Sequence, residues 1–183
     1  MRVEHTDIDG LVELFPMVFE DDRGYFLETF HKDKFESIGV TSTFLQTNQS
    51  YSKKGVLRGL HFQKPPHAQG KLARVIFGKV LDVVVDMRVG SPTHGDHKKF
   101  ILDAERNNMV YVPEGFAHGF LAIEDSYFAY QCTNLYHKES ESGIIWNDPD
   151  LAIDWELEKY GILKPIVSDK DLVLPSFEAL SKL

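Results

Sequence analysis

The chain has 183 residues, of which 43% are hydrophobic, and a net charge of −8. This length and apolar content suit a single globular domain, residues 1–183, with a sizeable core. The negative charge argues against a protein that binds nucleic acid or an anionic membrane, because either role needs a basic surface.

Cysteine usage and the lack of long apolar runs predict where the protein resides. Cys132 is the only cysteine, so no internal disulfide can form, and such a chain suits a reducing compartment. No apolar run approaches the roughly 20 residues that span a bilayer. The first ten residues also lack the apolar stretch of a secretory signal. We therefore expect a soluble, cytoplasmic protein.

Short strands separated by turn residues dominate the first part of the chain. Strands are predicted over 11–19 and 25–30, on either side of an acidic turn that ends at Gly24. A short helix is predicted over 31–39, with Gly39 as its C-cap.

In the middle of the chain, strands are predicted over 71–77 and 80–88. Gly78-Lys79 joins them and is typical of a two-residue hairpin with glycine at its first central position. Within 80–88, apolar residues alternate with a set that includes Asp82 and Asp86. This period of two indicates one face buried in a core and a second, partly polar face.

Further strands are predicted over 98–103, 109–112, 118–124 and 126–136, and a final helix over 176–183, with Ser176 as N-cap and Glu178 in the first turn. Many strands at short spacing, with helices only at the margins, indicate an all-β fold of antiparallel sandwich or barrel type. A barrel of this kind can hold one small ligand in its mouth.

Two histidines in glycine-flanked contexts are the first candidates for chemistry. His61 lies in "RGLHFQ" and His118 in "PEGFAHGF". The second stretch matches Pro-x-Gly-x-x-His, a half-motif of cupin barrels whose histidine commonly binds metal. The first half-motif is incomplete, because Gln63 stands where a second histidine is needed and Lys71 follows downstream. Glutamine and a nearby cation both disfavour a divalent metal.

Three interpretations of His61 therefore stay open from the residues alone. It is a metal ligand, a buried structural histidine bonded to a carbonyl, or a base that works without metal. In a regular strand Arg58 lies on the face opposite His61, and Lys71 belongs to the next strand.

Several longer stretches together resemble one known family. They are "DDRGYFLETF", "QTNQSYSKKGVLRGLHFQKPPHAQGKL", "VPEGFAHGF", "YQCTNLYHKESESGIIWNDPDLAIDW" and "VSDKD". From about residue 10 to residue 175 the chain is similar to the dTDP-4-dehydrorhamnose 3,5-epimerase (RmlC) family. This resemblance implies a metal-free cupin-type double-stranded β-helix, a jelly-roll barrel with short peripheral helices. It also implies an isomerase that needs no cofactor.

The resemblance assigns four catalytic residues for epimerisation next to a 4-keto group. His61 is the base, since imidazole titrates near neutral pH, and Asp171 orients it, with Asp169 as the alternative partner. Lys71 stabilises the enolate. Tyr130, protonated at neutral pH, donates from the opposite face. On residue type alone, each would be assigned an ordinary place in a loop, strand or core.

The remaining matched positions are assigned to substrate binding. They are Arg23, Phe26, Glu28, Gln46, Thr47, Asn48, Arg58, His118, Tyr136, Glu141 and Lys170. Arginine in particular suits the diphosphate. The resemblance implies a homodimer in which residues 20–30 reach the neighbouring subunit's site. Its substrate is a dTDP-4-keto-6-deoxy sugar.

Two positions depart from the family's pattern and put nucleotide contacts in doubt. Thr47 replaces a common aspartate, and Leu135 stands where a second tyrosine is frequent. Whether C3, C5 or both are epimerised stays open, as does the nucleotide and sugar pathway. A metal-dependent cupin enzyme and a catalytically silent sugar-binding barrel are the competing hypotheses.

Overall fold

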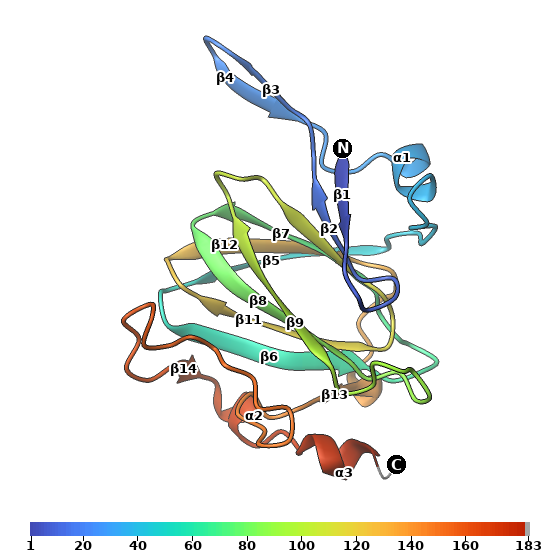
Figure 1. Ribbon diagram of the computed structural model, residues 1–183, viewed down its shortest axis with the longest axis vertical. Helices are drawn as coiled ribbons and strands as arrows, with labels where there is room; N and C mark the ends of the chain where they lie inside the picture. The colour runs from blue at the N-terminus through green and yellow to red at the C-terminus, as the bar shows by residue number, and fades with distance from the viewer. Residues whose placement is uncertain (182–183) are drawn as a thin grey trace.

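The computed structural model describes residues 1–181 and has two facing β-sheets as its body (Figure 1). In spatial order, the first sheet contains β1 (Arg2–His5), β2 (Val12–Phe15), β10 (Met109–Val112), β7 (Lys71–Phe77), β12 (Ser126–Cys132) and β5 (Gln46–Ser52). The second contains β13 (Glu141–Gly143), β6 (Val56–Gln63), β11 (Phe116–Ala122), β8 (Lys79–Asp86) and β9 (His97–Asp103), with β14 (Ile166–Val167) parallel to β6.

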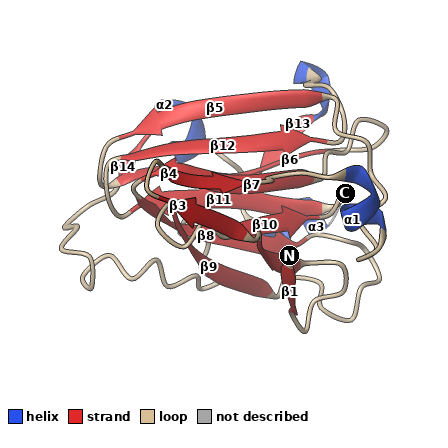
Figure 2. Ribbon diagram, turned by 90° about the horizontal axis from the view of Figure 1, so that it is seen from above, coloured by secondary structure: helices blue, strands red, loops and turns tan. Residues whose placement is uncertain are grey.

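The remaining elements lie outside these sheets. They are the β3 (Val18–Asp21) and β4 (Gly24–Leu27) hairpin, α1 (Lys32–Glu36), α2 (Asp169–Leu172), α3 (Phe177–Ser181) and a 3-10 helix (Lys138–Ser140). Seen from above, the strands run across the body and the loops gather at its two ends (Figure 2). The predicted all-β jelly-roll barrel with short peripheral helices is confirmed. None of the helices within residues 1–181 is long and apolar enough to cross a membrane.

Two apolar cores lie on either side of the second sheet. The core between the sheets contains Val84, Val110 and Phe128, whereas Leu81 and Trp155 belong to a core on the outer side, covered by the C-terminal segment. Strand β8 is therefore buried on both faces. Its alternation was predicted correctly, but the partly polar face that carries Asp82 is turned into the barrel and is shielded from solvent.

The predicted hairpin at Gly78-Lys79 is wrong. Strand β7 pairs with β10 and β12 in the first sheet, and β8 pairs with β11 and β9 in the second. Gly78, at φ +76°, instead turns the chain from one sheet to the other. A Cβ there would lie 2.0 Å from the Asp125 carbonyl oxygen, so this corner requires glycine.

Several predicted boundaries also shift. Pro16 and Met17 divide the predicted strand 11–19 into β2 and β3, β4 ends at Leu27, and β12 ends at Cys132 instead of residue 136. The helix predicted over 31–39 is shorter, although Gly39 still adopts φ +88° beyond its end. Ser176 Oγ accepts from the Ala179 N–H at 3.3 Å, as expected of an N-cap, and predicted helical residues 182–183 lie outside the described part.

A bulge in β6 corrects the predicted orientation of Arg58. His118 faces His61, but Phe120 faces Arg58, so two residues of β6 lie opposite Gly119 alone. The extra residue shifts the alternation by one position. Arg58 and His61 therefore lie on the same side of the strand and line the same cavity, whereas the sequence placed them on opposite faces.

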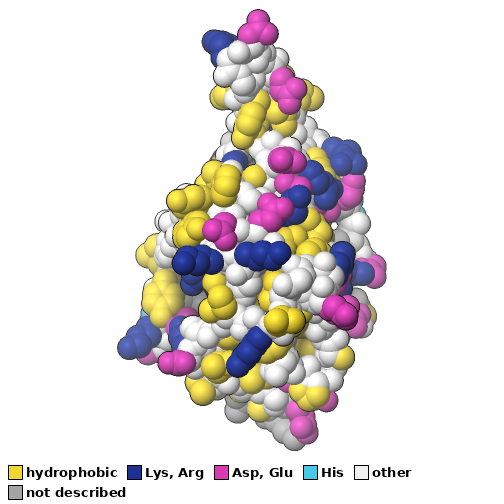
Figure 3. Space-filling view, turned by 90° about the vertical axis from the view of Figure 1, so that its left-hand side faces the viewer, with side chains coloured by type: hydrophobic (Ala, Val, Ile, Leu, Met, Phe, Trp, Pro, Cys, Tyr) yellow, Lys and Arg dark blue, Asp and Glu magenta, His cyan; other side chains and the backbone are white. Residues whose placement is uncertain are grey.

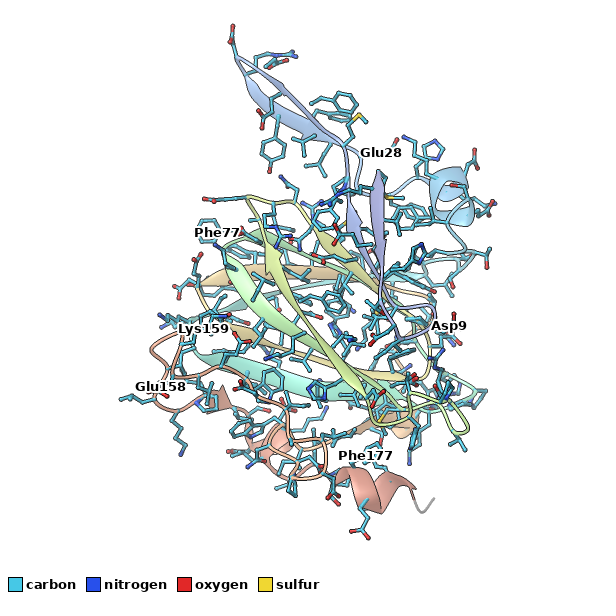
Figure 4. The ribbon with its side chains drawn as sticks, viewed as in Figure 1. Asp9, Glu28, Phe77, Glu158, Lys159 and Phe177 are labelled. Atoms are coloured by element: carbon cyan, nitrogen blue, oxygen red, sulfur yellow. The ribbon has the colours of Figure 1, made fainter. Side chains whose placement is uncertain are left out.

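The hairpin formed by β3 and β4 projects from one end of the body (Figure 1). We call residues 18–27 the arm. It carries exposed Phe19, Tyr25 and Phe26, and hydrophobic side chains are visible along it in Figure 3. Glu28 lies at the base of the arm (Figure 4). Within residues 1–181, no residue of the arm belongs to any of the three apolar clusters of the body.

Replacing Gly59 with alanine tests the bulge. A Cβ at Gly59 would lie 2.5 Å from the Gly119 Cα, whereas a Cβ at Gly90 meets nothing within 4 Å. Both glycines have positive φ. We expect Gly90→Ala to reduce the free energy of unfolding in urea by about 1–2 kcal/mol through backbone strain alone. Gly59→Ala should cost about 1–3 kcal/mol more through overpacking. Equal losses would show that the close approach is unimportant.

Candidate active site

A cavity of about 340 Å³ opens between the two sheets. Strands β5, β7 and β12 form one wall, β6 and β11 form the other, and α2 lies at the rim. Eight of the residues predicted from the sequence line it: His61, Lys71, Tyr130, Asp171, Asn48, Arg58, His118 and Lys170. An adjoining hollow of about 140 Å³ adds Gln46, Tyr136 and Glu141.

His61 and Asp171 form a tight imidazole–carboxylate pair. His61 Nε2 lies 2.6 Å from Asp171 Oδ1, while Asp171 Oδ2 accepts a long hydrogen bond from the Gly59 N–H at 3.4 Å. Burial raises the pKa of the Asp171 carboxyl, but the hydrogen bond and charge of His61, with hydrogen bonds to Gly59 and Ser168, lower it overall. The ionised carboxylate therefore fixes the ring and stabilises its protonated form.

Ser168 places Asp171 at this position. Its side chain caps α2 by accepting from the Asp171 N–H at 3.2 Å. Asp171 is 4% exposed, whereas Asp169 in the same helix faces solvent. Of the two aspartates considered from the sequence, it is Asp171 that pairs with His61.

Lys71 lies close to both His61 and Tyr130. Its Nζ is 3.4 Å from the His61 carbonyl oxygen and 5.9 Å from the centre of the Tyr130 ring. Burial lowers the pKa of the Lys71 ammonium, and the charges of Asp82 and Glu141 oppose part of that shift. A cation in this water-poor location can stabilise negative charge that develops on a bound molecule.

Tyr130 faces His61 from the opposite sheet. It lies on β12, while His61 lies on β6, so the cavity separates the two side chains. Burial raises the pKa of the Tyr130 phenol, and a hydrogen bond with Asn48 counteracts that rise only in part. The phenol therefore keeps its proton at neutral pH and can act as a donor.

A second imidazole–carboxylate pair lies deeper in the barrel. His118 Nε2 is 2.8 Å from Asp82 Oδ2, and both side chains are buried. Asp82 Oδ1 has no hydrogen-bond partner in the described part of the chain. His61 and His118 thus each point Nε2 at its own carboxylate. Within residues 1–181, no group of three or more histidine, cysteine, aspartate or glutamate side chains is arranged to hold a metal ion.

Basic and acidic side chains alternate around the mouth of the cavity. Arg58 Nε donates to Ser52 Oγ at 3.0 Å, and its exposed guanidinium stays available to a ligand. Lys170 pairs with Glu141, whose other oxygen accepts from the Tyr136 hydroxyl at 2.9 Å. Burial raises the pKa of Glu141, but these two hydrogen bonds lower it overall.

Four predicted binding residues lie away from the cavity within this chain. Arg23 and Phe26 belong to the arm, and Glu28 at its base pairs with Lys34 at 2.7 Å. Thr47 lies on the outer face of β5, in a separate hollow, while its neighbours Gln46 and Asn48 point inward.

Sequence reasoning missed three side chains that shape the site. Asp82 holds His118, Ser168 caps α2, and Ser50 lines the cavity between Asn48 and Arg58. An acidic residue inside the apolar run of β8 was a usable signal for Asp82, because a buried charge needs a partner. Ser168 and Ser50 carry no comparable signal.

This arrangement can remove a proton from one side of a bound molecule and deliver one from the other. His61 with its carboxylate is the basic side, Tyr130 is the acidic side, and Lys71 supplies positive charge nearby. Arg58 and Lys170 can attract an anionic group at the mouth.

The chain is similar to known epimerases along nearly its whole length. A family model described as dTDP-4-dehydrorhamnose 3,5-epimerase matches residues 5–179. The enzyme of that name from Methanothermobacter thermautotrophicus is 49% identical over 171 residues, which cover 93% of this chain and 91% of the relative.

Solved structures agree with this similarity. An RmlC epimerase from Mycobacterium tuberculosis gives a TM-score of 0.95 at 40% identity, covering 100% of this chain and 91% of its own. The RmlC of Legionella pneumophila, in complex with dTDP-4-keto-L-rhamnose, gives 0.91 at 43% identity, with 97% and 93% covered. ChmJ, a 3'-monoepimerase from Streptomyces bikiniensis bound to dTDP-quinovose, gives 0.89 at 33% identity, with 97% and 88% covered. The chain therefore belongs to the dTDP-4-dehydrorhamnose 3,5-epimerase family.

Proposed function

We propose that this protein is an isomerase that converts dTDP-4-dehydro-6-deoxy-D-glucose to dTDP-4-dehydro-L-rhamnose, as a step of dTDP-L-rhamnose biosynthesis. It inverts C3 and C5, the two carbons next to the 4-keto group. The observation that carries the proposal is the His61–Asp171 pair across the cavity from Tyr130, with Lys71 close to both.

Each inversion consists of two proton transfers. His61 removes the proton alpha to the ketone, and the C–H electrons form an enolate whose oxygen Lys71 stabilises. Tyr130 returns a proton to the same carbon from the opposite face. The imidazolium then loses its proton to solvent and the phenolate regains one, so the reaction requires no cofactor and no net redox change.

The other predicted residues bind the substrate in this proposal. Arg58 and Lys170 contact the diphosphate, because their cationic groups border the cavity. His118, held by Asp82, lines the sugar pocket, and Asn48 and Gln46 offer amide groups to the sugar or base. Tyr136 and Glu141 lie at the outer end of the site and contact the nucleotide side. Residues 1–183 act as one domain in the cytoplasm.

A mono-epimerase acting on C3 or C5 alone is the second candidate. The similarity to a 3'-monoepimerase supports this second candidate, because that enzyme shares the fold over nearly the whole of this chain. A metal-dependent reaction is a further alternative; it predicts loss of activity with a chelator and recovery with added metal.

Proton NMR in deuterated water tests the function directly. Incubation with dTDP-4-dehydro-6-deoxy-D-glucose should introduce deuterium at both C3 and C5. Deuterium at one carbon only would make the protein a mono-epimerase. The absence of exchange at either carbon, with folded protein, would sink the proposal.

Two variants separate the roles of the facing groups in the same experiment. His61→Ala should abolish deuterium incorporation, because general bases typically contribute about 10²–10⁴-fold. Tyr130→Phe should retain exchange through His61 but lose most inversion, since only the returning proton is removed. Near-normal turnover in both variants would mean that other groups carry the chemistry.

Asp171→Asn tests the carboxylate partner, with Asp169→Asn as matched control in the same helix. We expect kcat to fall by about 10²–10⁴-fold in Asp171→Asn only, because an amide no longer stabilises the imidazolium.

The lowered pKa of Asp171 also predicts that its contribution to folding stability, about 1–3 kcal/mol, is present at pH 7. That contribution should disappear as pH falls below about 4, where the unfolded carboxyl protonates first. Urea unfolding of Asp171→Asn and Asp169→Asn, at pH 7 and at a pH below about 4, measures how the stability contributed by Asp171 depends on pH.

We further infer a homodimer in which the arm of one subunit completes the site of the other. The exposed aromatic residues of the arm support this, as does an apolar hollow on the outer face of the first sheet, near Ile76 and Met109. Patches of this kind mark interaction sites in folded proteins.

Mixing two impaired variants tests whether the arm acts across the dimer. Phe26→Ala should raise KM through a weakened arm, and His61→Ala lacks the base. A mixed dimer contains one site with both Phe26 and His61 intact. Because random exchange makes about half of the dimers mixed, the mixture should regain about a quarter of wild-type activity. No regain, despite subunit exchange seen by light scattering with size-tagged protein, would place the arm at its own subunit's site or outside the reaction.

A further inference from the structure

Two histidines outside the cavity stack on each other. His67 lies in the loop between β6 and β7, and His137 lies in the loop after β12. Their ring centroids are 3.7 Å apart and their planes differ by 10°. Both side chains are half-buried. The loops that carry them leave the strands of His61 and Tyr130, so the stack joins two catalytic strands at one end of the barrel.

One hydroxyl serves both rings. Ser140 Oγ lies 2.9 Å from His67 Nδ1 and 3.1 Å from His137 Nδ1. Because a hydroxyl has one proton, it donates to one Nδ1 and accepts from the other. Two neutral imidazoles with opposite tautomers satisfy this arrangement. A first added proton is also accommodated, since the oxygen can accept from both rings.

Gln63 ties the same two loops together. Its Nε2 donates to the His67 carbonyl at 2.6 Å and to the Leu135 carbonyl at 3.1 Å, and its Oε1 accepts from the His137 N–H at 2.7 Å. We call His67, His137, Ser140 and Gln63 the histidine clamp. Gln63 is 5% exposed, so its amide bonds are shielded from water.

The histidine clamp is directly joined to residues at the outer end of the site. Tyr136 precedes His137, and Glu141 follows Ser140. Glu141 in turn accepts from Tyr136 and Lys170. A movement of Ser140 or His137 therefore displaces the carboxylate that orders this part of the cavity's rim.

We propose that the histidine clamp positions Tyr136 and Glu141 for the nucleotide sugar, and that full protonation of its two imidazoles releases them. This inference rests on the proposed function, which assigns Tyr136 and Glu141 to substrate binding. Two stacked imidazolium rings would hold like charges at 3.7 Å, which is unfavourable in a partly buried place. His67 and His137 are thus positioning residues whose effect falls on binding and not on proton transfer.

Charged groups on the neighbouring elements do not remove this repulsion, because two of them are cations that add to it and two are carboxylates that oppose it. They are Lys64 in the loop after β6, Lys138 and Glu139 in the 3-10 helix, and Glu141 in β13. In the described part of the chain, Glu139 is the one that pairs with either ring, at 3.5 Å from His137 Nδ1, and its side chain is 78% exposed. Such an exposed pair is worth little.

Calorimetric binding of dTDP-quinovose measures the effect without catalysis. This ligand lacks the ketone, and its diphosphate has no group that titrates near neutral pH. We expect the wild-type affinity to fall by about tenfold between about pH 7.5 and about pH 5.5, because acid favours the doubly protonated, released clamp. His67→Phe keeps a stacked ring that cannot be protonated, so its affinity should fall clearly less. Because His61 and His118 are unchanged in this variant, the difference reports the clamp alone.

Ser140→Ala supplies the second readout. Loss of the shared hydroxyl should raise KM and weaken binding by about 3–10-fold at pH 7.5, the size of one or two hydrogen bonds. The value of kcat should stay within about twofold. His5→Phe, an exposed histidine on β1, controls for surface substitution, and His137→Phe replaces His67→Phe if the latter does not fold.

Equal pH dependence of binding in the wild type and His67→Phe would overturn the proposal. So would a fall in kcat for Ser140→Ala with unchanged binding. Deuterium exchange by the wild type is measured separately: pH-dependent binding without exchange refutes the proposed activity and leaves the clamp standing. Deuterium exchange together with an affinity that does not change with pH refutes the clamp alone.

Discussion

The close approach of Gly59 to Gly119 is the constraint on which the site depends. A Cβ on Gly59 would collide with the Gly119 Cα, and a Cβ on Gly119 would lie 2.6 Å from the Arg58 carbonyl oxygen. Only two glycines allow β6 to carry its extra residue at this point. That residue turns Arg58 to the side of His61 and brings the Gly59 N–H within reach of Asp171. The cation proposed to bind phosphate and the proposed base thus share one face of one strand.

Burial and pairing act in opposite directions on the ionisable groups of the cavity. Asp171 and Asp82 lie in an apolar barrel, and each keeps an imidazole as its partner. Among residues 1–181, no carboxylate is in hydrogen-bond contact with Lys71, and burial lowers the pKa of its ammonium. A bound enolate would provide the negative charge that the free protein lacks there. The positive charge in the cavity is therefore better balanced when an anion develops on a bound molecule than when the cavity is empty.

The sequence predicted the architecture and the groups of the cavity through different signals. Alternation in 80–88 and regular turn residues were enough for an all-β fold. Motif resemblance located His61, Tyr130 and Asp171, which are up to 110 residues apart along the chain and line one cavity. Periodicity alone could not have joined them, because the contact depends on the C-terminal segment folding back on β6.

The errors arise where one local signal fits two structures. A glycine followed by lysine suits a hairpin, but it also suits the corner at Gly78, and only the pairing of β7 and β8 with other strands distinguishes them. The side of the strand predicted for Arg58 was wrong because a β-bulge interrupts the regular alternation of side chains, and the residue composition does not reveal the bulge. Thr47 was selected by resemblance, yet strict alternation in β5 directs it outward. The arm packs against neither sheet within residues 1–181, so its functional placement follows from the proposed homodimer and from no pattern in a single chain.

The order in which the chain is made has a consequence for the His61–Asp171 pair. All strands of the first sheet, including β12 with Tyr130, and β6, β8, β9 and β11 of the second are complete before residue 133, but the carboxylate arrives only with α2. During synthesis the base therefore exists for some time as an unassisted imidazole inside a nearly finished barrel. A product cut short before Ser168 would keep most of the hydrophobic core between the sheets and lack the ionic partner of its base. The His61–Asp171 contact thus forms late in the nascent protein, and its formation reports that the C-terminal segment has docked.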